Sequence, residues 1–192
     1  MAATSTMLPL GTTAPPFSLP DTVSGRTVSL DDYADKRALL VMFICNHCPF
    51  VKHVRGGLAA LGRDYSDADI GIVAISPNDP TDHPDDSPEA MAIEAKDAGY
   101  VFPYLYDEPQ EVAKAYTAIC TPDFFLFGPD RTLVYRGRMD ESRPNMPLPV
   151  TGEELRAAID AVLADETLAE EQYPSMGCSI KWRPGNAPSY AA

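Results

Sequence analysis

The sequence predicts an α/β domain in which a central mixed β-sheet is flanked by helices. The first observation is an apolar run at 38–44 that leads directly into a helical pattern at 50–65. The second is another apolar run at 69–76, which completes a β-α-β unit with a right-handed crossover. The third is a pair of strand-like runs, at 123–127 and 132–137, whose separation by a tight-turn composition indicates an antiparallel hairpin.

The N-terminal third of the chain supplies the opening segment, a central strand and a helix. Residues 8–30 are rich in Pro, Gly and Thr, and 26–30 alternate in polarity, so we expect one edge strand or hairpin there. The run at 38–44 is continuously apolar, which is typical of a strand buried on both faces. Gly56 and Gly57 in the following helix each cost about 1 kcal/mol relative to Ala, which predicts a bend or close packing.

The middle of the chain is expected to form an insert around 77–102. Four prolines and four aspartates lie at 77–88, and this composition predicts an exposed loop. A helix at 88–98 follows, with Ser87 as its cap and Gly99 beyond its end. We then expect a short strand at 103–106 and a short helix at 110–118.

The C-terminal part is expected to add one helix and a tail. Thr151-Gly-Glu-Glu154 resembles a capping box, and Leu155, Ile159 and Val162 then fall on one face of the helix that it opens. The tail, 166–192, has Trp182 and Cys178 as its conspicuous anchors. We expect the tail to pack on a single domain formed by 1–165.

Composition excludes several classes of function. The formal net charge of −13 argues against nucleic acid and against an anionic membrane surface as partners, because both would repel this chain. The start resembles no secretory signal, and no run reaches the roughly 20 apolar residues that span a bilayer. Four cysteines are too few for a disulfide scaffold in 192 residues. We therefore expect a cytoplasmic protein in a reducing compartment.

The motif Cys45-Asn-His-Cys48 is the strongest candidate site. A thiol between a buried strand and a helix faces free N–H groups and the positive end of the helix dipole, which stabilise a thiolate. The sequence thus favours Cys45 as nucleophile, Cys48 as the resolving thiol one helical turn away, and His47 as a group that stabilises the Cys45 thiolate.

Metal binding is the rival interpretation of this motif. Cys45, His47 and Cys48 are ligand types, and His53 follows closely. Structural zinc generally takes a second ligand pair, however, and Cys120 and Cys178 are isolated in the sequence. We therefore expect neither a metal nor another cofactor. A further alternative is that the two cysteines of the motif are inert buried thiols.

Several motifs together resemble the thioredoxin-like superfamily. Gly11-Thr-Thr-Ala-Pro-Pro-Phe-Ser-Leu19 and the strand leading to Cys45 resemble the opening of the redoxin group, which includes alkyl hydroperoxide reductases and peroxiredoxins. Narrower resemblance, to a peroxiredoxin-like branch, comes from three motifs: Cys45-Asn-His-Cys-Pro-Phe-Val-Lys-His53, Cys120-Thr-Pro-Asp-Phe-Phe-Leu-Phe127 and Pro174-Ser-Met-Gly-Cys-Ser-Ile-Lys-Trp182. The resemblance covers nearly the whole chain and implies a thioredoxin fold.

The resemblance also implies roles for residues downstream of the motif. It implies a cis peptide bond between Thr121 and Pro122 opposite the C-x-x-C motif, with the backbone of Thr121 free to bind a substrate strand. Cys120 would lie beside the site, either as an auxiliary thiol or as a small packing residue. Peroxiredoxins carry Thr or Ser three residues before the reactive cysteine and Arg at the position of Pro122, whereas this chain has Met42 and proline.

The function expected from these observations is thiol-disulfide exchange by a Cys45/Cys48 dithiol-disulfide couple, on protein or low-molecular-weight substrates, with a reductant such as thioredoxin or glutathione. The first alternative is a peroxiredoxin-like thiol peroxidase that reduces hydroperoxides through Cys45. The second is a redox-responsive or metal-binding interaction module. Cys178 is either a third redox cysteine or a packing residue of the tail.

Overall fold

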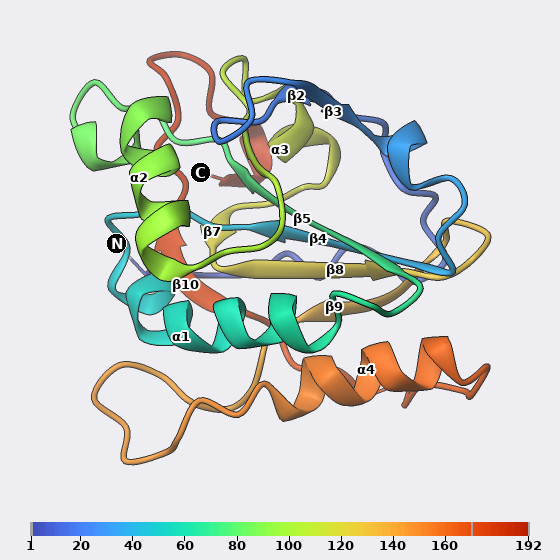
Figure 1. Ribbon diagram of the computed structural model, residues 1–192. Helices are drawn as coiled ribbons and strands as arrows, with labels where there is room; N and C mark the ends of the chain where they lie inside the picture. Colours follow the sequence, from blue (N-terminus) through green and yellow to red (C-terminus); the bar gives the residue numbers. More distant parts are fainter. Residues whose placement is uncertain (1, 170, 192) are drawn as a thin grey trace.

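The computed structural model describes residues 2–169 and 171–191, and its centre is a five-stranded mixed sheet (Figure 1). The strand order is β6-β5-β4-β8-β9. The strands are β4 (Ala38–Phe43), β5 (Ile70–Ser76), β6 (Tyr104–Tyr106), β8 (Asp123–Phe127) and β9 (Leu133–Gly137). β4 pairs parallel with β5 and antiparallel with β8, so the sheet is mixed as predicted.

β4 lies in the middle of this sheet because every one of its residues is apolar. Alternate side chains of a strand point to opposite faces, and here both faces are covered. Leu40 and Met42 pack into one core cluster and Leu39, Val41 and Phe43 into another. The strand therefore delivers its C-terminal end, where the candidate motif begins, from a rigid and fully buried position.

Helices and a hairpin cover the two faces (Figure 1). On one face lie α1 (Pro49–Asp64), α2 (Pro88–Ala98) and α4 (Glu153–Leu163), which share a core cluster with alternate residues of β4. On the other lie α3 (Glu111–Ala115) and the hairpin of β2 (Ser18–Pro20) and β3 (Thr27–Ser29). Three short 3-10 helices, η1 (Leu30–Tyr33), η2 (Pro84–Asp86) and η3 (Ser189–Ala191), complete the described elements.

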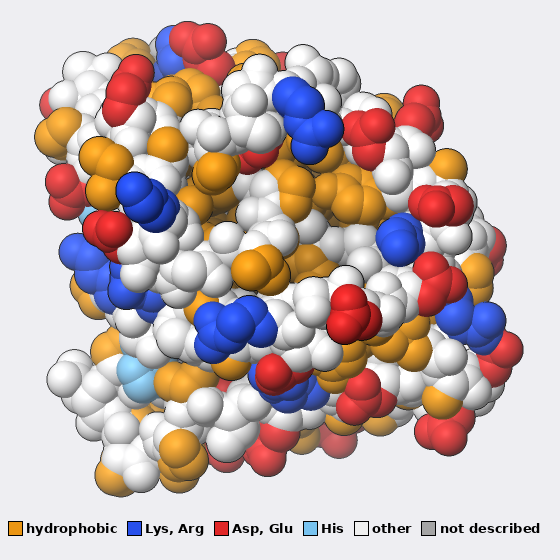
Figure 2. All heavy atoms as spheres, viewed as in Figure 1, with side chains coloured by type: hydrophobic (Ala, Val, Ile, Leu, Met, Phe, Trp, Pro, Cys, Tyr) orange, Lys and Arg blue, Asp and Glu red, His pale blue; other side chains and the backbone are white. Residues whose placement is uncertain are grey.

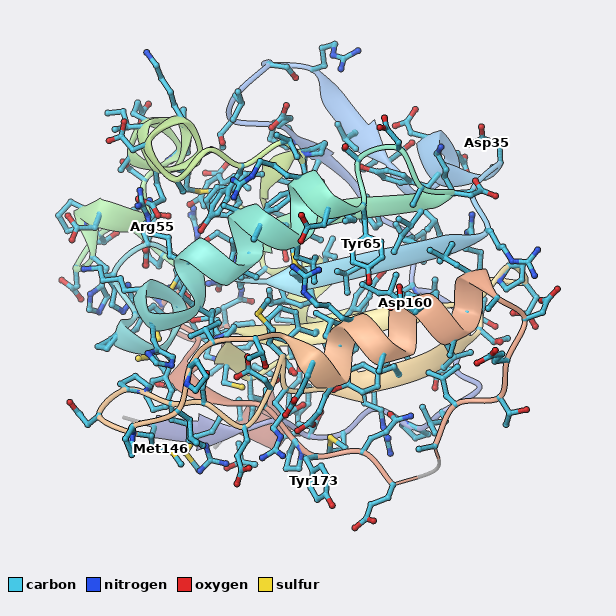
Figure 3. All side chains as sticks on the ribbon, turned by 60° about the horizontal axis from the view of Figure 1, so that its bottom comes forward. Asp35, Arg55, Tyr65, Met146, Asp160 and Tyr173 are labelled. Atoms are coloured by element: carbon cyan, nitrogen blue, oxygen red, sulfur yellow. The ribbon has the colours of Figure 1, made fainter. Side chains whose placement is uncertain are left out.

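The helix that carries the motif is fixed against its neighbours. At its C-terminal end the Tyr65 hydroxyl donates a hydrogen bond to Asp160 of α4 over 2.7 Å, and Figure 3 shows these two side chains side by side. A Cβ at Gly57 would lie 2.7 Å from Val150, so the close packing expected at this glycine is present. The N-terminal end of α1 is thereby held in a defined position.

A second, three-stranded sheet involves both ends of the described chain. It has the order β1-β10-β7, from β1 (Ala2–Thr4), β10 (Met176–Ser179) and β7 (Cys120–Thr121). All pairs are antiparallel, with Cys178 opposite Thr121. The sequence pattern did not predict this sheet, because none of the three segments shows a long alternation and their pairing joins residues far apart in the sequence.

Two local predictions are wrong. The segment 77–88 is not an exposed loop throughout, because Asn78 and Asp86 are buried. The capping box at α4 does not form: Gly152 is the N-cap residue, and Asp140 accepts hydrogen bonds from the Thr151 and Gly152 N–H groups at 2.8 and 2.6 Å. In the part of the chain that the structure describes, no helix combines the length and apolar character needed to cross a bilayer.

Candidate active site

The loop between β4 and α1 brings the motif to the N-terminus of the helix. Cys48 is the N-cap residue of α1, Pro49 is its first residue, and Cys45 lies three residues before Cys48 in the loop. Proline suits this position because the first helical N–H has no intrahelical acceptor. The sequence placed Cys45 at the mouth of the helix, and the structure corrects this, since Cys48 occupies that position.

The sulfur of Cys48 is surrounded by hydrogen-bond donors. The thiols of Cys45 and Cys178 and the backbone N–H groups of Val51 and Cys178 lie near it, and the Cys48 thiol itself donates to the Thr121 carbonyl oxygen. Together these donors lower the pKa of Cys48 despite its burial, with the bond from Cys45 contributing most. The Val51 N–H is one of the free donors of the first helical turn. Cys48 is therefore the thiol whose thiolate the structure stabilises.

Cys45 has the opposite environment. Its pKa is raised, first because it donates its hydrogen bond to Cys48, then by burial and by the negative charge of Asp86. Its sulfur also lies 3.0 Å from the Thr121 hydroxyl oxygen, a contact that partly offsets these effects. The Cys48 sulfur lies 3.2 Å from the Thr121 carbonyl oxygen, so both thiols of the motif meet at the same residue.

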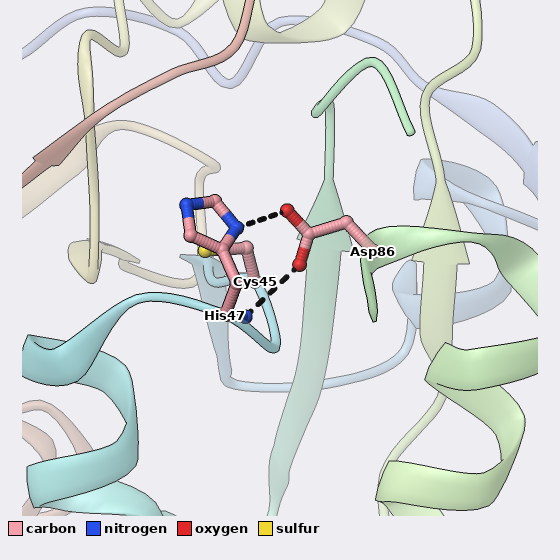
Figure 4. Close-up of side chains that lie close together, drawn as sticks. All are labelled: Cys45, His47 and Asp86. Carbon is pink, nitrogen blue, oxygen red and sulfur yellow. Dashed lines mark hydrogen bonds and ion pairs between the residues drawn. The ribbon is translucent and has the colours of Figure 1, made fainter. Parts of the chain in front are cut away.

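Asp86 holds the motif loop from the side of η2. One carboxylate oxygen accepts the backbone N–H groups of Asn46 and His47 at 2.8 and 3.1 Å. The other accepts the Asn78 amide at 2.7 Å and the His47 ring nitrogen Nδ1 at 2.5 Å. Figure 4 shows the ring and the backbone of His47 both directed at this carboxylate. Four donors thus satisfy a charge that is completely buried.

His47 forms hydrogen bonds to the Asp86 carboxylate through both its backbone N–H and its ring. Because an ionised carboxylate only accepts, Nδ1 carries the proton in the pair with Asp86. One face of the His47 ring stacks on the ring of His83, with 4.3 Å between the ring centroids and 12° between the ring planes. His53, which the sequence placed near the motif, instead lies 3.1 Å from the Ser142 hydroxyl.

The structure brings together a different set of possible metal ligands from the set that the sequence suggested. Cys45, His47 and Asp86 offer ligand atoms within 4.8 Å of one another, whereas His53 is engaged elsewhere. A cation at this cluster would have to displace donors from Asp86, because both carboxylate oxygens already accept two hydrogen bonds. The geometry fits a carboxylate that orients the loop better than a metal ligand.

The peptide bond between Thr121 and Pro122 is cis, which confirms the expectation drawn from the family resemblance. The backbone of Thr121, however, is not free to bind a substrate strand. β10 already pairs with it, with Cys178 opposite Thr121. A Cβ added at Gly177 would lie 2.0 Å from the Thr121 carbonyl oxygen, so β10 is seated directly against this peptide. The strand β10 of the chain itself thus occupies the place at Thr121 where a substrate strand was expected to bind.

Two buried residues, Cys120 and Asp123, flank the peptide of Thr121 and Pro122. Cys120 is fully buried, burial raises its pKa, and its thiol points to the Pro122 carbonyl oxygen 3.9 Å away. Asp123 is also fully buried, and burial raises its pKa to about 7 although the Ser5 hydroxyl donates a hydrogen bond to it. Asp123 thereby connects the start of β8 to the N-terminal residues.

Sequence reasoning found Cys45, His47 and Cys48 but missed Asp86, Asp123 and β10. Asp86 is one of four aspartates in a proline-rich segment, and no local signal separates it from its exposed neighbours. Asp123 carried one usable signal, because it is an acidic residue at the start of an otherwise apolar strand. A buried carboxyl beside a redox motif could have been anticipated there.

Comparison with known proteins gives one family and several relatives. The model of the AhpC/TSA family matches residues 10–136. A protein of Mycobacterium tuberculosis strain CDC 1551, named as a candidate peroxiredoxin, is 34% identical over 115 residues, which cover 59% of this chain and 67% of the relative. The corresponding protein of strain H37Rv matches equally.

Solved structures extend the likeness over the whole chain. An uncharacterised conserved protein of Geobacillus kaustophilus is 54% identical, with a TM-score of 0.94 and coverage of 96% of this chain and 98% of that one. A hypothetical protein of Sinorhizobium meliloti is 47% identical, with a TM-score of 0.93 and coverage of 95% and 99%. The thioredoxin domain of a Bacteroides vulgatus thiol-disulfide oxidoreductase, 20% identical with a TM-score of 0.57 over 72% and 91% of the two chains, shows the shared thioredoxin fold.

Proposed function

Because the chain belongs to the AhpC/TSA family, we propose that it is a thiol-disulfide oxidoreductase in which Cys48 and Cys45 form the reactive couple. The observation that carries the proposal is the position of Cys48 at the N-cap of α1, where the free N–H groups of the first helical turn and the neighbouring thiols of Cys45 and Cys178 favour its thiolate. A thiolate is the nucleophile in disulfide exchange, and these donors favour it. The roles of the two cysteines are thus the reverse of those expected from sequence.

In the proposed reaction a substrate disulfide is the oxidant of the two cysteines. The Cys48 thiolate attacks one sulfur of a substrate disulfide, forms a mixed disulfide and releases the other half as a thiolate. Cys45 then loses its proton, attacks the Cys48 sulfur and releases the second half. The substrate is reduced to two thiols, and the protein keeps a Cys45–Cys48 disulfide that a thiol donor such as glutathione or thioredoxin reduces.

The neighbouring residues have positioning roles in this proposal. Asp86 and His47 hold the loop so that Cys45 points at Cys48. Thr121 places a hydroxyl and a carbonyl oxygen against the two thiols, and Pro122 fixes the turn of that segment. The basic side chains near α1 do not gather into a binding surface for a large anion: Arg55 pairs with Glu94, and Figure 2 shows Lys and Arg lying among Asp and Glu on that face.

A single-turnover reaction with Ellman's reagent, a small aromatic disulfide, tests the assignment of roles. We expect Cys48→Ser to abolish the fast release of the coloured thiolate and Cys45→Ser to keep it, because only Cys48 makes the first attack. Circular dichroism of both variants provides the control for folding. A fast phase that survives in Cys48→Ser and disappears in Cys45→Ser would restore the assignment made from sequence.

The Mycobacterium tuberculosis relatives favour a second candidate, the reduction of hydroperoxides. The Cys48 thiolate would attack the terminal peroxide oxygen, release an alcohol or water and become a sulfenic acid, which Cys45 would convert into a disulfide with loss of water. Stopped-flow oxidation by hydrogen peroxide separates the two functions. A rate no faster than that of free cysteine thiolate would exclude the peroxidase.

A further inference from the structure

The strand β10 occupies the site in the way that a bound client strand would. It pairs antiparallel with β7, so that Cys178 lies opposite Thr121, the residue that touches both thiols of the motif. Gly177 packs against the Thr121 peptide so closely that no larger residue fits without displacement. The C-terminal segment of the chain thus places Cys178 beside the motif.

Cys178 contacts Cys48 directly. Cys178 packs against the core cluster that contains Cys48, and its thiol and backbone N–H are close enough to lower the pKa of Cys48. The exposures of the thiols differ in a way that matters for access: Cys45 is 1% and Cys48 0% exposed, whereas Cys178 is only partly buried. An external thiol or disulfide therefore meets Cys178 first and reaches the Cys45/Cys48 couple more slowly while β10 is in place.

We propose that Cys178 is a shuttle thiol, which exchanges disulfides with Cys48 and passes them to low-molecular-weight thiols at the surface. This inference rests on the proposed function of the Cys45/Cys48 couple and adds the route by which that couple is reduced. It also favours small thiols and disulfides over extended protein strands as partners, because β10 fills the place of such a strand.

The shuttle consists of three successive thiol-disulfide exchanges. The Cys178 thiolate attacks the Cys48 sulfur of the Cys45–Cys48 disulfide, forms a Cys48–Cys178 disulfide and releases Cys45, which takes up the proton that Cys178 lost. An external thiolate then attacks the Cys178 sulfur and releases Cys48. A second external thiol attacks the mixed disulfide and frees Cys178, so that two external thiols become one disulfide. The reverse sequence carries oxidation inward.

The direction of the second step follows from the environments of the two sulfurs. In disulfide exchange the thiol of lower pKa is the better leaving group. The pKa of Cys48 is lowered by its donors, while burial and the bond to Cys48 raise the pKa of Cys178. Attack at the exposed Cys178 sulfur with departure of Cys48 is therefore favoured by both access and leaving-group stability.

Peptide mapping of the full chain under non-reducing conditions detects the intermediate. Trypsin places Cys45 and Cys48 together on the peptide 38–52 and Cys178 on the peptide 157–181. After titration with glutathione disulfide and acid quenching, we expect a disulfide-linked pair of these two peptides. If no disulfide joins the peptides 38–52 and 157–181 at any point of the titration, the shuttle does not exist.

Kinetics of reduction by glutathione test the role of Cys178 in turnover. We expect the oxidised Cys178→Ser variant to be reduced at least about tenfold more slowly than the wild type, because the couple is then reachable only when β10 moves away. Ser179→Ala, on the same strand with no side-chain bond to the motif, is the matched control and should stay within about twofold of the wild type. Equal rates for Cys178→Ser and wild type would overturn the proposal.

The Cys48→Ser variant separates the two claims. If Cys48→Ser loses exchange while Cys178→Ser and wild type behave alike, only the shuttle fails. If Cys48→Ser retains wild-type exchange, the proposed function fails, whatever the result for Cys178. Thermal unfolding of Cys178→Ser and Ser179→Ala shows whether either substitution displaces β10 through a loss of stability instead of a loss of the thiol.

Discussion

At the scale of residues, the surroundings of the two thiols of the motif shift their pKa values in opposite directions. The pKa of Cys48 is lowered by neighbours in Cys45, β10 and the first turn of α1, whereas the contact with Cys48, burial and the Asp86 carboxylate raise the pKa of Cys45. The motif sequence is almost symmetrical in its cysteines, but its surroundings are not. The asymmetry comes from where the helix starts, one residue after Cys48.

Asp123 predicts a pH dependence of stability. Its pKa is raised by burial to about 7 in the folded protein and is about 3.9 in an unfolded chain. Its contribution to stability is therefore fully present below about pH 4 and is lost as the pH rises through about 7. Since one pH unit corresponds to about 1.4 kcal/mol, the loss is at most about 4 kcal/mol.

The Asp123→Asn variant isolates this effect. We expect it to match the wild type in free energy of unfolding near pH 4 and to be the more stable protein near pH 8, because the amide carries no charge to bury. Urea unfolding of both proteins across this range measures the difference. Parallel pH profiles for wild type and variant would show that Asp123 does not titrate in this interval.

At the scale of elements, local patterns predicted most of what positions the motif. The apolar run of β4, the helix α1 and the hairpin of β8 and β9 follow from residues that are close in sequence, and the structure confirms them. The short strands β7 and β10 could not be found in this way. Their pairing is non-local, and two-residue and four-residue strands have too few positions to show a period.

The contact of β10 with β7 gives a prediction that does not involve a cysteine. Gly177→Ala would place a methyl group 2.0 Å from the Thr121 carbonyl oxygen, so β10 must shift away. We expect a loss of about 2 kcal/mol in the free energy of unfolding. We also expect faster alkylation of Cys48 by iodoacetamide, measured by mass spectrometry of the peptide 38–52.

Gly56→Ala is the matched control for this substitution. No heavy atom lies within 4 Å of the added Cβ, and the residue lies inside α1. Alanine should therefore stabilise the helix by up to about 1 kcal/mol and leave the alkylation of Cys48 unchanged. An alkylation rate for Gly177→Ala equal to that of the control would mean that β10 does not restrict access to the site.

At the scale of the whole molecule, the charge of the chain acts on every small partner. The formal net charge is −13, so an anionic disulfide is repelled and a cationic one attracted over distances comparable to the Debye length. We expect added salt to accelerate the reaction with the anionic Ellman's reagent and to slow that with the cationic disulfide cystamine. The same direction of change for both reagents would contradict this long-range effect.

The whole molecule also explains which parts of the candidate site could be predicted from the sequence. The strand-to-helix junction and the cis proline follow from a family pattern that covers most of the chain. The buried Asp86 and the strand that carries Cys178 come from segments about 40 and 130 residues away, brought to the motif only by tertiary packing. These long-range contacts set the surroundings of the two thiols and cover the motif.

The alkylation rate of each thiol of the motif as a function of pH tests whether Cys48 is the reactive thiolate. Tandem mass spectrometry of the peptide 38–52, taken from wild-type protein after brief exposure to iodoacetamide, gives an apparent pKa for each of the two thiols. We predict that Cys48 titrates well below the value of about 8.5 for a free cysteine and that Cys45 titrates above it. An apparent pKa of Cys48 at or above that of free cysteine, or a lower value for Cys45, would contradict the account.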